Sequence, residues 1–152
     1  MTSAHRGGLP SRPAGATDAE VKAAGKISEA LEWVERARGH LFTFHQEIGH
    51  ADFLLDDAIE LLEAGGHHDL ADLVRLEAVG ANVLDGRWTF QIVDEFEQGF
   101  YAEVRRVEAQ VRDALMDGQR HVFEAELKEA RRTRGRPGHE LRPNATNVVD
   151  AG

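Results

Sequence analysis

The chain contains no cysteine, which excludes disulfides, thiolate metal sites and a cysteine nucleophile. It has no apolar run close to the ~18 residues that a membrane-spanning helix requires. Its first eight residues also lack the apolar segment typical of a secretory leader. From these absences we expect a cytoplasmic protein that does not enter membranes.

Several catalytic signatures are missing as well. The sequence has no phosphate-binding glycine loop, no Gly-x-Ser-x-Gly nucleophile motif and no His-Glu-x-x-His zinc motif. Its formal net charge is −9 and its pI is near 5.3, a balance that repels the phosphates of nucleic acid. Nucleic acid is therefore not an expected partner of the chain as a whole.

What is present is one long helical pattern over Glu29–Leu62. Apolar or small residues recur there at intervals of four and three, at Ala30, Val34, Ala37, Leu41, Phe44, Ile48, Ala51, Leu55, Ala58 and Leu62. This spacing is the seam of a helix that packs lengthwise against other helices. Ser28 is a suitable N-cap and Gly65-Gly66 a suitable end, so the sequence predicts a helix over 28–64. Thr17 or Asp18 can cap an additional turn before it.

The rest of the chain predicts three further helices and two tails. One helix is capped by Asp69 and fades at Gly80, one covers 89–116, and one covers 120–133. The segment 83–90 contains Asp85-Gly86 and predicts a turn, with a short hairpin as the alternative. The fold class is all-α, an antiparallel bundle of about four helices, two long and two shorter, over 17–133. Residues 1–16 and 134–152 are too polar and glycine-rich to pack, and we expect them to be flexible.

The predicted long helix has a polar band halfway along it, made of Arg38, His40, His45, Glu47 and Asp52. The side of this helix away from the seam carries Phe42, Gly49 and Phe53, although a lone bundle would leave that side facing solvent. A glycine in the middle of a helix costs ~1 kcal/mol relative to alanine, so its presence indicates a close approach. We therefore expect a homodimer, with Phe42, Gly49 and Phe53 at the interface.

The polar band also suggests a metal site. The candidate ligands are His45, Glu47 and Asp52, with His121 and Glu124 from the last helix, a set suited to Fe, Mn or Zn. Glu47-x-x-His50 resembles the element that ferritin-like di-iron bundles use, and this resemblance implies a metal centre with partner carboxylates from other helices. The sequence has only one such element, and His121-x-x-Glu124 has the reverse order. The other interpretation is that these residues form interhelical ion pairs beside the seam.

The C-terminal tail is rich in arginine. Arg134-Gly135-Arg136-Pro137 resembles the core of an AT-hook, which implies contact with the minor groove of A·T-rich DNA through Arg134 and Arg136. The other interpretation is a solubilising tail whose first arginines complement the dipole of the preceding helix.

Three hypotheses for function follow from these patterns. The first is a non-catalytic helical interaction or scaffold protein that self-associates. The second is a helical bundle with a His/carboxylate site in the middle of the long helix, which would bind Fe, Mn or Zn if it is metal-dependent. The third is contact with nucleic acid through the arginine tail.

Overall fold

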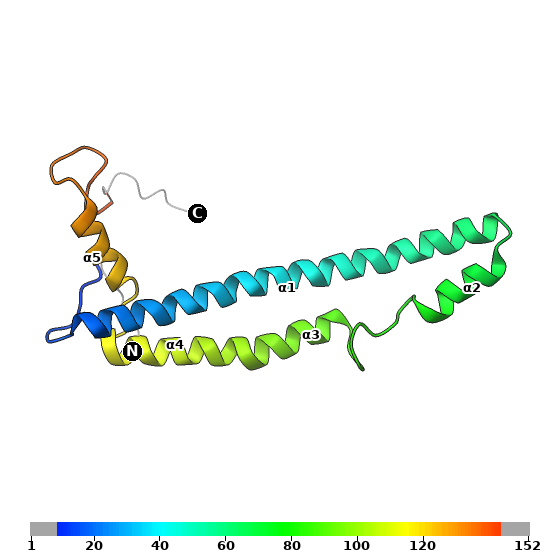
Figure 1. Ribbon diagram of the computed structural model, residues 1–152, viewed down its shortest axis with the longest axis horizontal. Helices are drawn as coiled ribbons and strands as arrows, with labels where there is room; N and C mark the ends of the chain where they lie inside the picture. The colour runs from blue at the N-terminus through cyan, green and yellow to red at the C-terminus, as the bar shows by residue number, and fades with distance from the viewer. Residues whose placement is uncertain (1–8, 144–152) are drawn as a thin grey trace, which may run out of the picture. The chain divides into compact units, whose positions relative to one another are not determined.

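The computed structural model describes residues 9–143. The described chain is all-α, as the sequence predicts, with a helical bundle fold (Figure 1). Its elements are α1 (Asp18–Ala64), α2 (His68–Glu77), α3 (Thr89–Phe96), the π-helical turn η1 (Glu97–Tyr101), α4 (Ala102–Met116) and α5 (Val122–Arg131). Because α3, η1 and α4 follow one another without a break, they form one long helix. The prediction of two long and two shorter helices is therefore confirmed.

The chain divides into two compact units. The terminal unit comprises Met1–Ala30 and Arg106–Gly152, of which residues 9–30 and 106–143 are described, and the central unit comprises Leu31–Arg105. Helix α1 contributes to both, with Asp18–Ala30 in the terminal unit and Leu31–Ala64 in the central one.

The long first helix begins ten residues before the predicted start at Ser28, so that boundary was wrong. Its actual start is a capping box, in which Thr17 Oγ1 accepts from the Glu20 backbone N–H and the Glu20 carboxylate accepts from Thr17. Gly25, which looks like a break in the sequence, lies inside the helix. A Cβ atom at Gly25 would lie 3.3 Å from Cβ of Phe123, so the glycine makes room for α5.

The segment 83–90 forms a tight turn followed by a helix. A single antiparallel bridge joins Leu84 to Arg87, and Gly86 adopts a φ of +65° between them. Helix α3 then begins at Thr89. The turn prediction is correct, and the Asp85-Gly86 hairpin alternative is reduced to this one bridge.

The terminal unit has a small apolar core. Val21 and Ala24 of α1 are buried against Met116 of α4 and Val122 of α5. Beside this core, the buried carboxylate of Glu108 accepts from Ser28 Oγ at 3.0 Å and from Arg112 Nε at 3.1 Å. The charge of Glu108 is thereby paired where burial would otherwise destabilise it.

The central unit is an antiparallel helical hairpin. Four polar contacts join its two arms in reverse order along the chain: Glu35 with Tyr101, His45 with Thr89, Asp52 with Gly80, and Glu63 with Arg75. Figure 1 shows α2 and α3 running back along the second half of α1. The arms are therefore held in register by side chains spread over the whole length of the hairpin.

The wide turn η1 interrupts the second arm. It brings the ring of Phe96 to 6.1 Å from the rings of both Phe100 and Tyr101. Tyr101 is buried against α1, whereas Phe100 is exposed. This turn is not predicted by the sequence, because the apolar spacing over 89–116 fits a regular helix.

The predicted seam of α1 is only half covered. The most buried positions of its central segment are Leu31 and Ile59, which lie beside the predicted seam rather than on it. Val34, Leu41, Ile48, Leu55 and Leu62 are half-buried, whereas Ala37, Phe44 and Ala51 are exposed. The prediction that the whole seam packs against other helices was therefore wrong. One returning arm covers only one side of α1.

The predicted tails are described in part. Arg12 pairs with Asp18 at 2.8 Å and with Glu126 at 2.6 Å, and Lys128 Nζ donates to the Leu141 carbonyl at 2.9 Å. Residues 1–8 and 144–152 lie outside the described residues, so their predicted flexibility stays a prediction. No helix within residues 9–143 has the length and apolar character needed to cross a membrane.

We expect Met116→Ala to destabilise the terminal unit. Met116 is only 1% exposed, and removing its side chain leaves a cavity between α1 and α5. The expected loss is about 2–5 kcal/mol of unfolding free energy, measured by urea denaturation. Met116→Leu, which conserves volume, serves as the control with a loss below about 1.5 kcal/mol. Equal stability of the two variants would contradict a packed core at this position.

Candidate functional site

The polar band of α1 is partly built into the hairpin. His45 Nδ1 and Thr89 Oγ1 share a hydrogen bond of 2.6 Å, and Thr89 is buried. About two helical turns further along α1, Asp52 Oδ1 accepts from the Gly80 backbone N–H at 3.0 Å. His45 and Asp52 therefore hold the loop before α3 against α1.

Glu47, the third candidate from α1, lies apart from this pair. It is exposed, like His40, because both occupy the side of α1 that the returning arm leaves uncovered. Arg38 faces the hairpin, forms an ion pair with Glu97 of η1 and lies over the Tyr101 ring at 5.0 Å. The Glu97 carboxylate raises the pKa of the Arg38 guanidinium above its usual value.

Tyr101 extends this network. Its hydroxyl donates to Glu35 Oε1 at 2.6 Å, and its ring lies beneath Arg38 and Arg105. The hydrogen bond to Glu35 and burial both disfavour the phenolate, so the pKa of Tyr101 is raised. The network thus joins α1 to the returning arm by one ion pair and one hydrogen bond.

A small pocket lies next to the polar band. It is a cavity of about 80 Å³ lined by Ile48, Gly49 and Asp52 of α1 and by Ala81, Val83, Trp88 and Thr89 of the returning arm. A Cβ atom at Gly49 would have no heavy atom of the described chain within 4 Å. The sequence indicated a close approach here, and none occurs within the described chain.

The five candidate metal ligands are not brought together. His45, Glu47 and Asp52 belong to the central unit, and His121 and Glu124 belong to the terminal unit. His121 Nδ1 lies 3.9 Å from Glu124 Oε2, so these two form a weak pair at the start of α5. Within residues 9–143, no three His, Asp or Glu side chains are grouped so that they could hold a metal ion.

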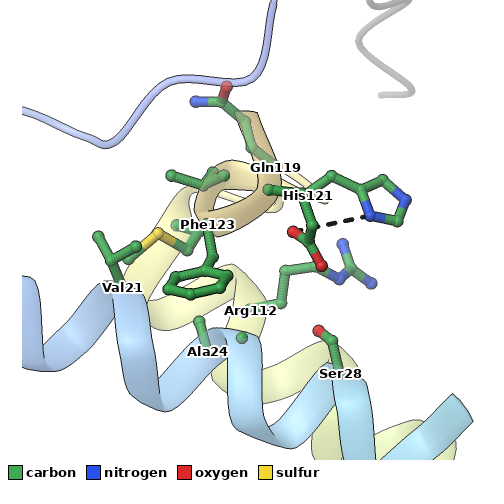
Figure 2. Close-up of a pocket in the computed structure, with 11 residues that line it drawn as sticks. Val21, Ala24, Ser28, Arg112, Gln119, His121 and Phe123 are labelled. Carbon is green, nitrogen blue, oxygen red and sulfur yellow. Dashed lines mark ion pairs between the residues drawn. The ribbon is translucent and has the colours of Figure 1, made fainter. Parts of the chain in front are cut away.

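The start of α5 borders a second, smaller cavity in the terminal unit. Figure 2 shows Phe123 lying over Ala24 of α1, with His121 on the outer side and its ion pair to Glu124 drawn as a dashed line. The cavity measures about 20 Å³. This is room for about one water molecule and too little for an organic ligand.

The predicted interface residues have different environments. Phe42 is half-buried with Arg38 at 5.0 Å from its ring, Gly49 is half-buried, and Phe53 is 72% exposed. Only Phe53 of the three therefore presents a large unpartnered apolar surface.

Sequence reasoning missed a longer apolar surface on α1. It runs through nine positions spaced by four and three: Trp33, Ala37, His40, Phe44, Glu47, Ala51, Leu54, Ala58 and Leu61. Ala58 is half-buried and the other eight are exposed. We call these nine residues the exposed stripe. The signal was present, because the apolar arc of α1 is wider than one neighbouring helix can cover.

The two candidate nucleic-acid contacts lie beyond α5. Arg134 is ion-paired with Glu129 at 2.6 Å, and the Arg136 N–H donates to the Thr133 carbonyl at 3.3 Å. Gly135 between them has a φ of +78°. The segment is thus a turn here, whereas the AT-hook resemblance implies an extended strand. DNA contact stays a prediction.

Comparison with known proteins found no matching family model, curated protein or solved structure.

We expect Glu35→Gln to lower the pKa of Tyr101 toward the ordinary tyrosine value of about 10, because the charged hydrogen-bond acceptor is lost. The chain has one tyrosine, so phenolate absorbance reports this group alone. Since the folded pKa is raised, its stabilising contribution is present below the unfolded pKa and is lost as the pH rises through the folded one. Glu32→Gln is the control and should leave the titration unchanged. An identical curve for both variants would rule out the Glu35 hydrogen bond.

We expect Gly49→Ala to raise the unfolding free energy by about 1 kcal/mol, since alanine favours the helix and its Cβ meets open space. Gly39→Ala is the matched control, because Gly39 also lies in α1 with nothing within 4 Å. Urea denaturation of both variants is the measurement. A loss of stability at Gly49 alone would show that another chain approaches there.

Proposed function

We propose that this chain is a non-catalytic helical interaction protein that self-associates through the exposed stripe of α1. The support is that the central unit has more large apolar side chains than its two arms bury. Its buried apolar residues are Leu31, Ile59, Ala71, Val93 and Tyr101. Its large exposed ones are more numerous: Trp33, Phe44, Phe53, Leu54, Leu61, Leu70, Leu73, Leu76, Leu84, Trp88, Phe90 and Phe100.

The stripe supports the proposal because its large apolar residues are regularly spaced along α1 as well as exposed. Trp33 is 62% exposed, Leu54 51% and Leu61 75%, and these three share one heptad position. Phe44, which is 37% exposed, lies at the adjacent heptad position of the same stripe. Single exposed apolar residues are normal on monomers, whereas an aligned series is the pattern of a helix that packs on another helix. Two hairpins paired in this way would form a bundle of four long arms.

The size of the stripe fits an interface. With about 150–250 Å² for each large side chain, the four largest residues alone expose on the order of 450 Å² per chain. The alanines and the flanking charged side chains extend this surface toward the ~800 Å² per partner that stable interfaces bury.

The other two hypotheses have less support. The metal hypothesis lacks a cluster of three potential ligands within residues 9–143, and its candidate His45 is engaged with Thr89. The nucleic-acid hypothesis depends on Arg134, which is engaged with Glu129. Neither is favoured by a particular contact.

We expect Leu54→Lys combined with Leu61→Lys to weaken self-association on the order of 100-fold or more, because each copy loses two apolar contacts of about 1.5–3 kcal/mol at full burial. Lysine favours the helix, so the fold should persist. Light scattering after size exclusion, over a concentration series, is the measurement.

Phe53→Lys is the matched control, because Phe53 is as exposed as Leu61 but lies off the stripe. This variant should assemble as the wild type does. A wild-type chain that stays monomeric at all concentrations would overturn the proposed function. Dissociation by Phe53→Lys alone would move the interface to the Phe42, Gly49 and Phe53 side.

A further inference from the structure

We infer that the occupant of the exposed stripe is the same stripe of a second copy, lying antiparallel to the first. This inference rests on the proposed function and adds the orientation and the pairing of residues. Two independent properties of the stripe carry it, the alternation of side-chain size and the distribution of charge.

Side-chain size alternates along the stripe. One line of positions carries the larger side chains Trp33, His40, Glu47, Leu54 and Leu61, and the other line carries Ala37, Phe44, Ala51 and Ala58. Except at Phe44, each large residue is therefore followed by an alanine. Close packing requires large side chains to face small ones across the interface.

An antiparallel pair satisfies this requirement. With the two-fold axis between His45 and Gln46, Trp33 faces Ala58 of the second copy, and Ala37 faces Leu54. His40 faces Ala51 in the same register. Only Phe44 and Glu47 are left as two larger side chains that face each other, beside the axis.

A parallel, in-register pair does not satisfy it. That arrangement stacks each residue on its own copy, so Trp33 meets Trp33 and alanine meets alanine. Layers would alternate between overpacked and void, and both faults destabilise an interface. Glu47 would also face Glu47 directly, with like charges in contact.

The charges on α1 give the same orientation. Residues 46–64 contain six carboxylates and no lysine or arginine, whereas residues 31–45 contain two arginines and two glutamates. A parallel pair would place the two acidic halves side by side. An antiparallel pair places each acidic half beside the half that carries Arg36 and Arg38, which reduces the repulsion.

One specific pair marks the edge of this interface. Arg36 lies beside the stripe with its guanidinium carbon 4.5 Å from the centre of the Trp33 ring. Asp57 lies on the same edge near the other end of the stripe. In the antiparallel register Arg36 comes nearly opposite Asp57 of the second copy, twice per dimer. Flanking charges of this kind set the orientation of paired helices.

A charge exchange tests the pairing. We expect Arg36→Glu and Asp57→Arg each to weaken self-association roughly three- to tenfold, since each variant puts two like charges together twice. The double variant Arg36→Glu/Asp57→Arg should return to within about threefold of the wild type, because the ion pairs are restored with reversed sign. Sedimentation equilibrium at low salt is the measurement. A double variant weaker than both single variants would overturn the pairing.

Distances between spin labels test the orientation directly, and the absence of cysteine means that one added cysteine labels one site. Glu60→Cys places the label on α1 away from the stripe. At 1.5 Å per residue, two antiparallel copies should hold these labels about 40–45 Å apart, whereas parallel copies would hold them about 20 Å apart. Gln46→Cys is the control, because a position near the axis gives a short distance in either orientation.

The outcomes separate this inference from the proposed function. A dimer with the long Glu60 distance and charge-exchange rescue supports both. A dimer with a short Glu60 distance overturns the antiparallel inference and leaves the proposed function standing. A chain that stays monomeric overturns both.

Discussion

The structure of the central unit depends on one geometric constraint. The apolar arc of α1 spans both the side that faces the returning arm and the side that carries the exposed stripe, and one neighbouring helix covers only part of such an arc. The returning arm holds its place through contacts such as Tyr101 with Glu35 and Thr89 with His45. The apolar surface of α1 that stays exposed supports the proposal that a helix of a second chain packs against it.

Two polar residues of α1 have a structural role in the hairpin. His45 and Asp52, which look like ligands in the sequence, are used to attach the loop before α3. Glu108 of the terminal unit is likewise buried with its charge matched by Arg112. At His45, Asp52 and Glu108 the polar group thus holds neighbouring elements together, so the residue type alone is a poor guide to chemistry.

The sequence predicted the helices well where their ends have a local chemical cause. Gly65-Gly66 and Asp117-Gly118 end helices because positive φ angles occur there, at Gly66, Asp117 and Gly118. The start of α1 was misplaced because Ser28 is a suitable N-cap and glycine disfavours a helix. Gly25 nevertheless lies inside α1, where it makes room for Phe123, nearly a hundred residues away. The most buried positions of α1 were also predicted wrongly, since Leu31 and Ile59 lie beside the predicted seam. A wide apolar arc does not indicate which of its sides packs against the neighbouring helix.

The wide turn η1 has a consequence for how the chain tolerates length changes. A regular helix places residues five apart on different sides, yet here Phe96 stacks on Tyr101 while also contacting Phe100. The turn therefore accommodates one residue more than an ordinary turn does. If one of residues 97–99 were absent, Phe100 and Tyr101 would follow Phe96 by three and four residues, the neighbouring positions of an uninterrupted α-helix. Every later residue of that helix would then be rotated by about 100° about its axis, so different side chains would face α1.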